Sequence, residues 1–263
     1  MPSFTDQIGN IITLPNHPRR IISLVPSQTE LLYEFGLDEE VIGITKFCVH
    51  PAKWFKSKQR VGGTKTVDIE KIKRLQPDLI VANKEENVQQ QIEALQLIAP
   101  VWVSDVNTLQ DALNMIDSLG QITGKVSNAA SLVSTIQSLF QALTINQNKP
   151  INVAYLIWQK PYMAAGGDTF INNMLTYCGF NNVLEHQMRY PEVTLQQLNE
   201  LDCHLLLLSS EPYPFTQKHI NEMQNQLPNT HIMLVDGEMF SWYGSRLVQA
   251  AAYFSKLKNQ VEA

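Results

Sequence analysis

Hydrophobic and polar positions follow the same pattern twice along this chain, in residues 67–83 and 193–209. The two segments read VDIEKIKRLQPDLIVAN and VTLQQLNELDCHLLLLS and are offset by 126 residues (193 minus 67). In each, apolar residues at helical spacing precede a continuous apolar run that is typical of a buried strand. We interpret them as two imperfect copies of one helix–strand unit; chance similarity between generic units is the alternative. A duplicated unit predicts two lobes with a cleft between them, which is a preferred place for a ligand.

The rest of the chain alternates between strand and helix patterns, which indicates an α/β fold with parallel sheets. Apolar runs bounded by turn residues predict strands at Ile21–Val25, Val41–Thr45, Leu79–Ala82, Val101–Val103, Asn152–Ile157, Asn182–Leu184, Leu205–Leu208 and Ile232–Val235. Helical spacing predicts helices at Thr29–Phe35, Ile69–Leu75, Val88–Leu97, Asp168–Cys178, Leu195–Leu201 and Gly244–Lys258.

The longest helical pattern lies between the two halves, where apolar positions from Ala129 to Leu143 form one stripe. Ser127 is a candidate N-cap, and Asn146–Pro150 ends the pattern. We expect about twenty residues of helix, spanning about 30 Å, to join the lobes as one rigid strut. The predicted organisation is an N-terminal α/β lobe over residues 1–123, a connecting helix over 124–147 and a C-terminal α/β lobe over 148–263.

Charge and hydropathy exclude several partners. The net charge of −5 and the absence of a dense Lys/Arg run argue against nucleic acid. No apolar run approaches the ~20 residues that cross a bilayer, so we expect no membrane insertion. The first twenty residues lack the pattern of a secretory signal. We therefore expect a cytoplasmic monomer as the sequence is written, and a periplasmic or surface-associated protein if the true start lies upstream.

Motifs of common enzymes are missing from the sequence. It contains no G-x-S-x-G, G-x-x-x-x-G-K-[ST], G-x-G-x-x-G or H-E-x-x-H. The six histidines have no ligand spacing, and the three cysteines form no C-x-x-C pair. We therefore predict no catalytic residue, no metal site and no prosthetic group.

Polar and aromatic residues gather after the predicted strands, where parallel sheets bind ligands. Aromatic rings on loops suit a broad, flat ligand, and cations suit carboxylates or phosphates at its rim. The alternatives are a structural cap for Ser27 and Thr29, solvated loops for the polar clusters, and a place inside the lobe for Phe240 and Trp242. The candidate ligand-binding residues are Ser27, Gln28, Lys46, Thr64, Glu85, Trp158, Lys160, Tyr162, Tyr190, Glu211, Trp242 and Arg246.

Two stretches resemble the helical-backbone substrate-binding proteins of ABC importers, the group that binds cobalamin and ferric siderophores. RIISLVPSQTE, at Arg20–Glu30, is similar to the opening strand and helix of that family, and Val67–Ile80 is similar to its internal segment. The resemblance implies two α/β lobes, a rigid helix, a shallow aromatic cleft and no catalytic activity. It also implies a permease partner and, as ligand, a corrinoid, a ferric siderophore or another metal chelate.

The sequence departs from that family at two functional positions. Glu70 matches one of two glutamates that dock on a permease, but Gln196 stands at the other and removes one charge-assisted contact. Thr64 stands where the cobalamin-binding branch has an aromatic residue, while Tyr190 retains one in the other lobe. A cytoplasmic enzyme or sensor of tetrapyrrole or cofactor metabolism, with Glu85 and Glu211 among its acidic residues, is the alternative function.

Overall fold

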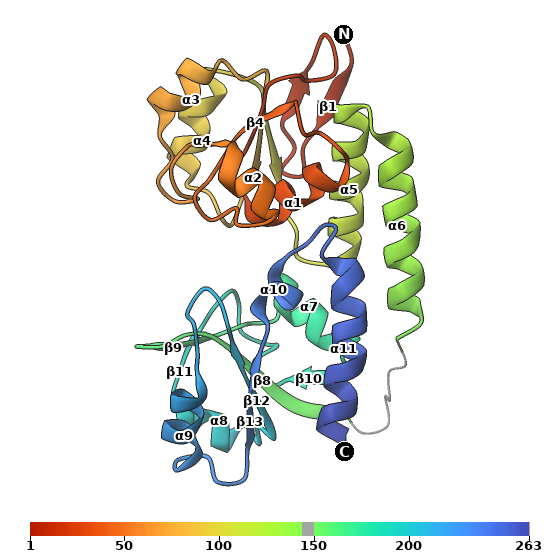
Figure 1. Cartoon of the computed structure of the whole chain (residues 1–263). Helices are drawn as coiled ribbons and strands as arrows, with labels where there is room; N and C mark the ends of the chain where they lie inside the picture. Colours follow the sequence, from red (N-terminus) through yellow and green to blue (C-terminus); the bar gives the residue numbers. More distant parts are fainter. Residues whose placement is uncertain (144–149, 263) are drawn as a thin grey trace. The chain divides into compact units, whose positions relative to one another are not determined.

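The computed structural model describes residues 1–143 and 150–262, and the chain divides into two compact units (Figure 1). The first unit comprises Met1–Val106, Gln110–Thr135 and Tyr243–Arg246. The second comprises Asn107–Leu109, Ile136–Trp242 and Leu247–Ala263. The division predicted from the sequence stays a prediction, and its boundary after residue 147 lies outside the described residues.

The first unit contains a five-stranded sheet in the order β5-β4-β3-β6-β7, and each neighbouring pair is parallel. The four strands predicted for this half are present, with bounds that differ by one or two residues. The strands are β3 (Ile21–Ser23), β4 (Val41–Ile44), β5 (Gln59–Arg60), β6 (Leu79–Asn83) and β7 (Val101–Ser104).

Helices flank this sheet, and α3 and α4 lie side by side (Figure 1). The elements are α1 (Pro26–Glu34), α2 (Ala52–Ser57), α3 (Ile69–Leu75), α4 (Gln89–Gln96) and α5 (Leu109–Thr123), with a hairpin of β1 (Ser3–Thr5) and β2 (Ile11–Thr13). The sequence patterns did not predict α5, although its apolar positions Leu113, Ile116 and Leu119 are buried at helical spacing.

Helix α1 begins three residues earlier than predicted. Pro26 opens it, because the fixed φ of proline suits the first helical position. Ser27 and Thr29 therefore lie inside the helix, and their predicted role as caps is wrong. Val25 is the N-cap, and its apolar side chain accepts no hydrogen bond from the helix.

The sheet of the second unit is mixed, in the order β11-β9-β8-β12-β13, with β10 also paired to β8. The pairs that β8 forms with β10 and β12, and β12 with β13, are parallel, whereas β9 runs antiparallel to its neighbours. The strands are β8 (Ile151–Trp158), β9 (Tyr162–Ala164), β10 (Phe180–Asn182), β11 (Glu192–Val193), β12 (Leu205–Ser209) and β13 (His231–Val235). The strand predicted at Asn182–Leu184 thus lies two residues earlier.

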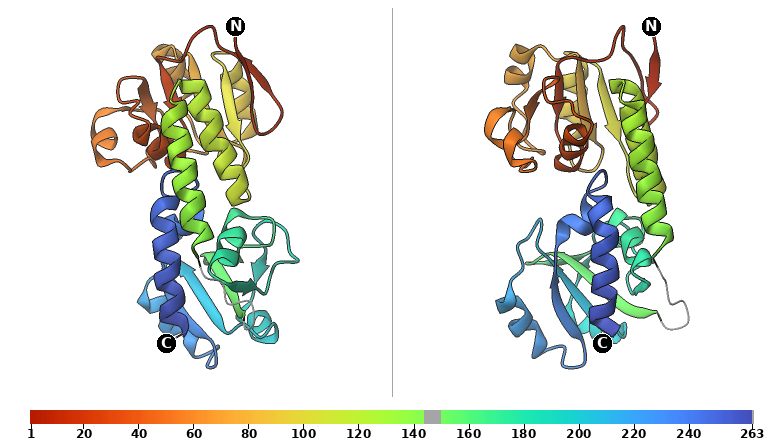
Figure 2. Two further views of the ribbon diagram at one scale, coloured as in Figure 1. Left: turned by 90° about the vertical axis from the view of Figure 1, so that its right-hand side faces the viewer. Right: turned by 45° about the vertical axis from the view of Figure 1, so that its right-hand side comes forward.

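Helix α11 runs alongside the sheet of the second unit (Figures 1 and 2). Phe254 of this helix lies with its ring centroid 4.8 Å from that of Phe240, which is fully buried. The alternative interpretation that placed Phe240 inside the lobe is confirmed. The helices are α7 (Phe170–Tyr177), α8 (Leu195–Glu200), α9 (Gln217–Gln224), α10 (Gly237–Ser241) and α11 (Leu247–Glu262).

Helix α6 (Val126–Gln141) corresponds to the predicted connecting helix. Its 16 residues are fewer than the expected twenty, and Ser127 lies inside it rather than at its cap. Residues up to Thr135 belong to the first unit and those from Ile136 to the second. The predicted end of the helix at Asn146 lies outside the described residues.

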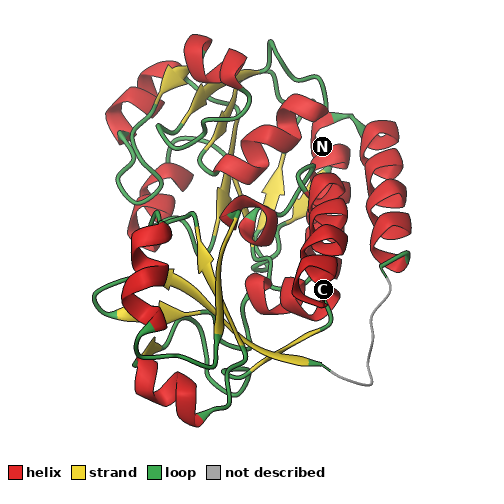
Figure 3. Ribbon diagram, turned by 60° about the horizontal axis from the view of Figure 1, so that its bottom comes forward, coloured by secondary structure: helices red, strands yellow, loops and turns green. Residues whose placement is uncertain are grey.

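The two repeated segments form the same local structure. Asp68 caps α3 and Thr194 caps α8, at positions separated by the repeat offset of 126 residues. After the helices, Gln76 and Asp202, again 126 apart, both adopt positive φ, at 47° and 55°. The strands that follow occupy equivalent places, since β6 lies between β3 and β7, and β12 lies between β8 and β13. The loop after β6 in the first unit and the loop after β12 in the second therefore follow equivalent strands. In each unit, helices flank the sheet (Figure 3).

Candidate functional site

Buried polar side chains join the carboxyl ends of β6 and β7 in the first unit. The amide nitrogen of Gln28 donates to Oγ of Ser104 at 2.5 Å and to the carbonyl of Ala82 at 3.2 Å. Asn83 donates to the same Ser104 hydroxyl at 2.9 Å. Gln28 is fully buried, and its Oε1 has no hydrogen-bond partner among the described residues. Gln28 therefore holds α1 against two strand ends, which is a structural role.

A second buried cluster lies at the ends of β3 and β4. The hydroxyl of Thr29 donates to Oγ of Ser23 at 2.7 Å and lies 3.1 Å from Sγ of Cys48. The Thr45 hydroxyl lies 3.1 Å from the same sulfur. Burial raises the pKa of the Cys48 thiol, so the reactive thiolate is disfavoured. This cysteine is a packed structural residue.

The loop after β6 carries two carboxylates in a turn with fixed geometry. Oδ1 of Asn83 accepts the backbone N–H groups of Glu85 and Glu86, each at 2.9 Å. Tyr243 donates to Oε1 of Glu86 at 3.4 Å. Burial first, and the nearby Glu86 charge second, raise the pKa of Tyr243 well above its usual value, so its hydroxyl keeps its proton. Glu85, a predicted ligand-binding residue, is half-buried in this turn.

Arg246 is buried in the first unit and forms an ion pair with Glu30 of α1. Nε and one terminal nitrogen of the guanidinium donate to the two carboxylate oxygens, at 3.0 and 2.6 Å. The sequence pattern placed Arg246 inside the C-terminal helix, but α11 begins at Leu247. The pair holds the Tyr243–Arg246 segment on α1, so Arg246 has a structural role that the sequence did not predict.

The loops that follow β4 and β5 are more open. Lys46 is exposed, and its ammonium lies 5.1 Å from the ring centroid of Phe47, which is 51% exposed. Thr64 is half-buried, and its carbonyl accepts a hydrogen bond from Asn87 at 2.9 Å. An exposed ring beside a cation can cover the face of a flat ligand and meet an anionic group at its edge.

In the second unit, Glu211 and Trp242 are brought into direct contact after β12. Oε1 of Glu211 accepts from the Trp242 indole at 2.9 Å and from Ser241 at 2.7 Å. Burial raises the pKa of Glu211, while the two donors act in the opposite direction. Ser209 donates to the Glu211 carbonyl at 2.5 Å and accepts from Tyr155 at 3.0 Å. Trp242 is 6% exposed, which confirms the alternative interpretation that placed it inside the lobe.

The end of β8 presents an exposed aromatic residue and a cation. Trp158 is 40% exposed, and its ring centroid lies 5.6 Å from that of Tyr213, which meets it edge-on. Lys160 follows in the turn before β9, is exposed, and adopts a φ of 66°. Both side chains are accessible to a ligand at this strand end.

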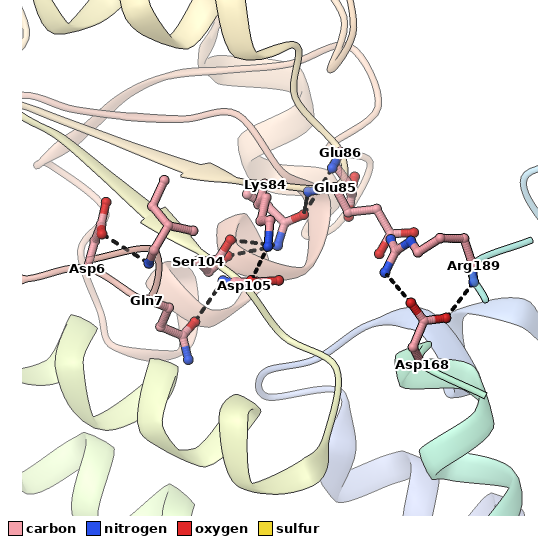
Figure 4. A network of polar contacts seen from close by, with 11 residues as sticks. Asp6, Gln7, Lys84, Glu85, Glu86, Ser104, Asp105, Asp168 and Arg189 are labelled. Atoms are coloured by element: carbon pink, nitrogen blue, oxygen red, sulfur yellow. Dashed lines mark hydrogen bonds and ion pairs between the residues drawn. The ribbon is translucent and has the colours of Figure 1, made fainter. Parts of the chain in front are cut away.

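The two predicted tyrosines of the second unit are half-buried. Tyr162 begins β9, and Tyr190 lies just before β11 with its ring centroid 5.8 Å from the Arg189 guanidinium. One guanidinium nitrogen of Arg189 lies 3.7 Å from the Asp168 carboxylate, and the Arg189 backbone N–H also donates to Asp168 (Figure 4). This pair fixes the loop that carries Tyr190.

The two residues predicted to meet a permease occupy equivalent positions in the repeated units. Glu70 is exposed in the first turn of α3, and Gln196 is exposed in the first turn of α8. The Gln196 amide donates to Oε1 of Glu200 at 2.9 Å. Their docking role stays a prediction.

Three residues that complete these arrangements were missed from the sequence. Phe47 and Tyr213 each lie a few residues after a strand, so the rule that selected the other aromatic residues would have found them. Glu30 gave no local signal, because its partner Arg246 lies 216 residues away in the sequence.

Within residues 1–143 and 150–262, no group of three or more His, Cys, Asp or Glu side chains is arranged to hold a metal ion. The helices of this part of the chain are all too short or too polar to cross a membrane.

Comparison with known sequences identifies related binding proteins. A sequence model of the family described as periplasmic binding protein matches residues 21–233. The chain is 25% identical over 268 residues to a vitamin B12-binding protein of Vibrio parahaemolyticus, covering 95% of this chain and 94% of that protein. It is 28% identical over 208 residues to YvrC of Bacillus subtilis, an uncharacterized ABC transporter substrate-binding lipoprotein, covering 75% of this chain and 65% of that one.

Solved structures share the fold over nearly the whole chain. The periplasmic vitamin B12-binding protein of Vibrio cholerae aligns with a TM-score of 0.79 and 21% identity, covering 94% of this chain and 99% of that one. The periplasmic catecholate-siderophore-binding protein of the same species aligns with a TM-score of 0.80 and 17% identity, covering 98% and 99%. At these identities the likeness shows the fold alone.

Proposed function

This chain belongs to the periplasmic binding protein family, and from that premise we propose that it binds a cobalamin-like corrinoid for uptake by an ABC importer. Proteins of this family are substrate-binding proteins of ABC transporters and not enzymes. They carry their solute as cargo rather than as a prosthetic group. Family membership therefore decides against the alternative of a cofactor-metabolising enzyme.

The ion pairing of Arg246 and Arg189 favours a corrinoid over a ferric catecholate, and this observation carries the choice of ligand. Arg246 already meets Glu30, and Arg189 already meets Asp168. A ferric catecholate carries several negative charges, and such a ligand is held best by arginines that can turn their donors to it. A corrin ring is edged mainly by neutral amides, which need hydrogen-bonding groups rather than several cations.

An exposed aromatic residue gives the flat ring a surface to pack on. We assign the ring contact to Trp158 of the second unit, because its ring is accessible at the end of β8. Lys160 of the same unit, which is exposed, would meet the nucleotide phosphate of a cobalamin. The name of the Vibrio parahaemolyticus relative, a vitamin B12-binding protein, supports the same ligand class.

A thermal-shift series tests this proposal. The protein is heated with cyanocobalamin, with cobinamide, with hemin and with a ferric catecholate, each over a range of concentrations. A ligand at a hundred times its Kd should stabilise the fold by roughly 2.7 kcal/mol. We expect a concentration-dependent shift with the corrinoids. A shift with hemin or the ferric catecholate alone would overturn the choice of ligand, and no shift with any of them would overturn the proposal.

We further propose that the protein works outside the cytoplasmic membrane as a monomer and that Glu70 meets a cation of the permease. Glu70 is exposed in the first turn of α3, which Asp68 caps, and this placement supports the role. Glu70→Gln should reduce corrinoid uptake by cells without changing Kd, whereas Gln196→Glu should leave uptake equal or increase it. Uptake that is unchanged in Glu70→Gln would contradict the docking role. Release of the protein from cells by osmotic shock, or its recovery in the membrane fraction, would support this location.

A further inference from the structure

Trp158 is connected to the core of the second unit through an aromatic residue of another loop. Tyr213 lies between β12 and α9, and its ring meets Trp158 with an interplanar angle of 68°. On its other side, Tyr213 lies with its ring centroid 4.8 Å from that of Phe215. Phe215 is 5% exposed and belongs to the core of this unit. The orientation of Trp158 therefore depends on the placement of Tyr213.

A directed chain of hydrogen bonds holds Tyr213 in place. Nδ1 of His219 accepts the backbone N–H of Thr216 at 2.9 Å, so the neutral imidazole carries its proton on Nε2. Nε2 lies 3.1 Å from the Tyr213 hydroxyl and donates to it. Tyr213 in turn donates to Oε1 of Gln159 at 2.7 Å. Three hydrogen bonds thus run in one direction, from the N-terminus of α9 to the residue next to Trp158.

We propose that Tyr213 and His219 are positioning residues, which hold Trp158 in the orientation that receives the ring of the ligand. The inference rests on the proposed function, because it takes Trp158 as the residue that contacts the ligand. Without the Tyr213 hydroxyl, Gln159 loses the group that donates to its Oε1, and the neighbouring Trp158 side chain gains conformational freedom. A ligand must then restrict that freedom on binding, which lowers its affinity. Neither positioning residue needs to touch the ligand.

Two variants separate positioning from folding. Tyr213→Phe retains the ring but removes the hydroxyl and both of its hydrogen bonds. His219→Gln retains an acceptor for the Thr216 N–H, because Gln197 at the equivalent position of α8 accepts the Thr194 N–H at 2.8 Å. The same variant removes the imidazole that donates to Tyr213.

Quenching of tryptophan fluorescence by acrylamide tests the positioning without any ligand. The other three tryptophans are at most 6% exposed, so the quenching reports mainly on Trp158. We expect both variants to change the quenching constant while thermal unfolding stays close to that of the wild type. Tyr177→Phe, which removes a hydroxyl from a half-buried ring of the same unit, is the control and should leave quenching unchanged. An unchanged constant in both variants would overturn the inference.

Titration with cyanocobalamin tests the consequence for binding. We expect Kd to rise roughly fivefold in His219→Gln, the scale of one lost hydrogen bond, and at least as much in Tyr213→Phe, which loses two. In a Trp158→Ala background the same changes should have no further effect, because the positioned ring is gone. A full fivefold effect in that background would overturn the inference and leave the proposed function in place. If the wild type binds no corrinoid, the proposed function fails, and the quenching result alone then decides whether Tyr213 and His219 position Trp158.

Discussion

The indole N–H of Trp242 donates a 2.9 Å hydrogen bond to Oε1 of Glu211 in the same unit. The sequence pattern assigned each of these residues to a ligand site, but here they are hydrogen-bond partners of each other. A carboxylate removed from water requires such donors, and Ser241 provides a second. Gly237 permits the close packing, because a Cβ there would lie 2.6 Å from Cγ of Glu211. Glu211 and Trp242 pack against each other after β12, and the titration of Glu211 makes the free energy of unfolding depend on pH.

Glu211→Gln should flatten the pH dependence of stability. Burial raises the pKa of Glu211 above its ordinary value of 4.5, so the folded state holds a proton that the unfolded chain releases. The resulting stabilisation is fully present below pH 4.5 and is lost as the pH rises through the raised pKa. Glutamine keeps an oxygen that accepts from Trp242 but carries no charge.

Urea denaturation at a series of pH values measures this effect. We expect the free energy of unfolding of Glu211→Gln to equal or exceed that of the wild type at neutral pH. A wild type that gains stability over the variant as the pH rises above 4.5 would contradict the raised pKa.

Trp158 and Trp242 should respond differently to replacement by alanine. Trp242 is 6% exposed, so Trp242→Ala should lower the free energy of unfolding by roughly 3–5 kcal/mol. Trp158 is 40% exposed, and Trp158→Ala should change it by only about 1 kcal/mol while weakening ligand binding. Denaturation and ligand titration of both variants provide the comparison. A large loss of stability in Trp158→Ala would instead identify this residue as core.

Regular segments could be predicted from the sequence because apolar periodicity reports burial. The helix–strand unit of α3 and β6 illustrates this, since its helix appears within the predicted bounds and its strand extends one residue further, to Asn83. Strands of two or three residues, such as β9 and β11, leave no periodic pattern, so the antiparallel part of the second sheet was missed. The start of α1 was misplaced because Ser27 resembles a cap, whereas Pro26 opens the helix.

The candidate site could be predicted only in part, because local sequence does not specify pairing. Position after a strand identified Glu211 and Trp158 without showing that Glu211 is half-buried and hydrogen-bonded whereas Trp158 is accessible. The partner of Arg246 required the fold, because Glu30 lies in the first helix of the chain. Such contacts depend on tertiary structure rather than on spacing.

The ion pair between Glu30 and Arg246 should stabilise the first unit only as a pair. Their side chains are 18% and 9% exposed, so either charge left alone is poorly hydrated. We expect Glu30→Gln to lower the free energy of unfolding by roughly 3 kcal/mol. Glu30→Gln combined with Arg246→Met should recover part of that loss, because no unpaired charge remains. A Glu30→Gln protein as stable as the wild type would show that solvent screens the pair.

The two repeated helices should lose similar stability when their caps are removed. Oδ1 of Asp68 accepts the Lys71 N–H at 2.9 Å, and Oγ1 of Thr194 accepts the Gln197 N–H at 3.1 Å. Asp68→Ala and Thr194→Ala should each cost about 1 kcal/mol. Asp68→Asn and Thr194→Ser retain an acceptor and are the matched controls. If only one alanine variant is destabilised, the two caps are not energetically equivalent.

Calorimetric titration of the purified protein with cyanocobalamin tests the central claim most directly, with hemin and a ferric catecholate titrated in parallel. The account predicts saturable binding of one corrinoid per chain, weakened by Trp158→Ala. Saturable binding of the ferric catecholate, with no heat from the corrinoid, would contradict it.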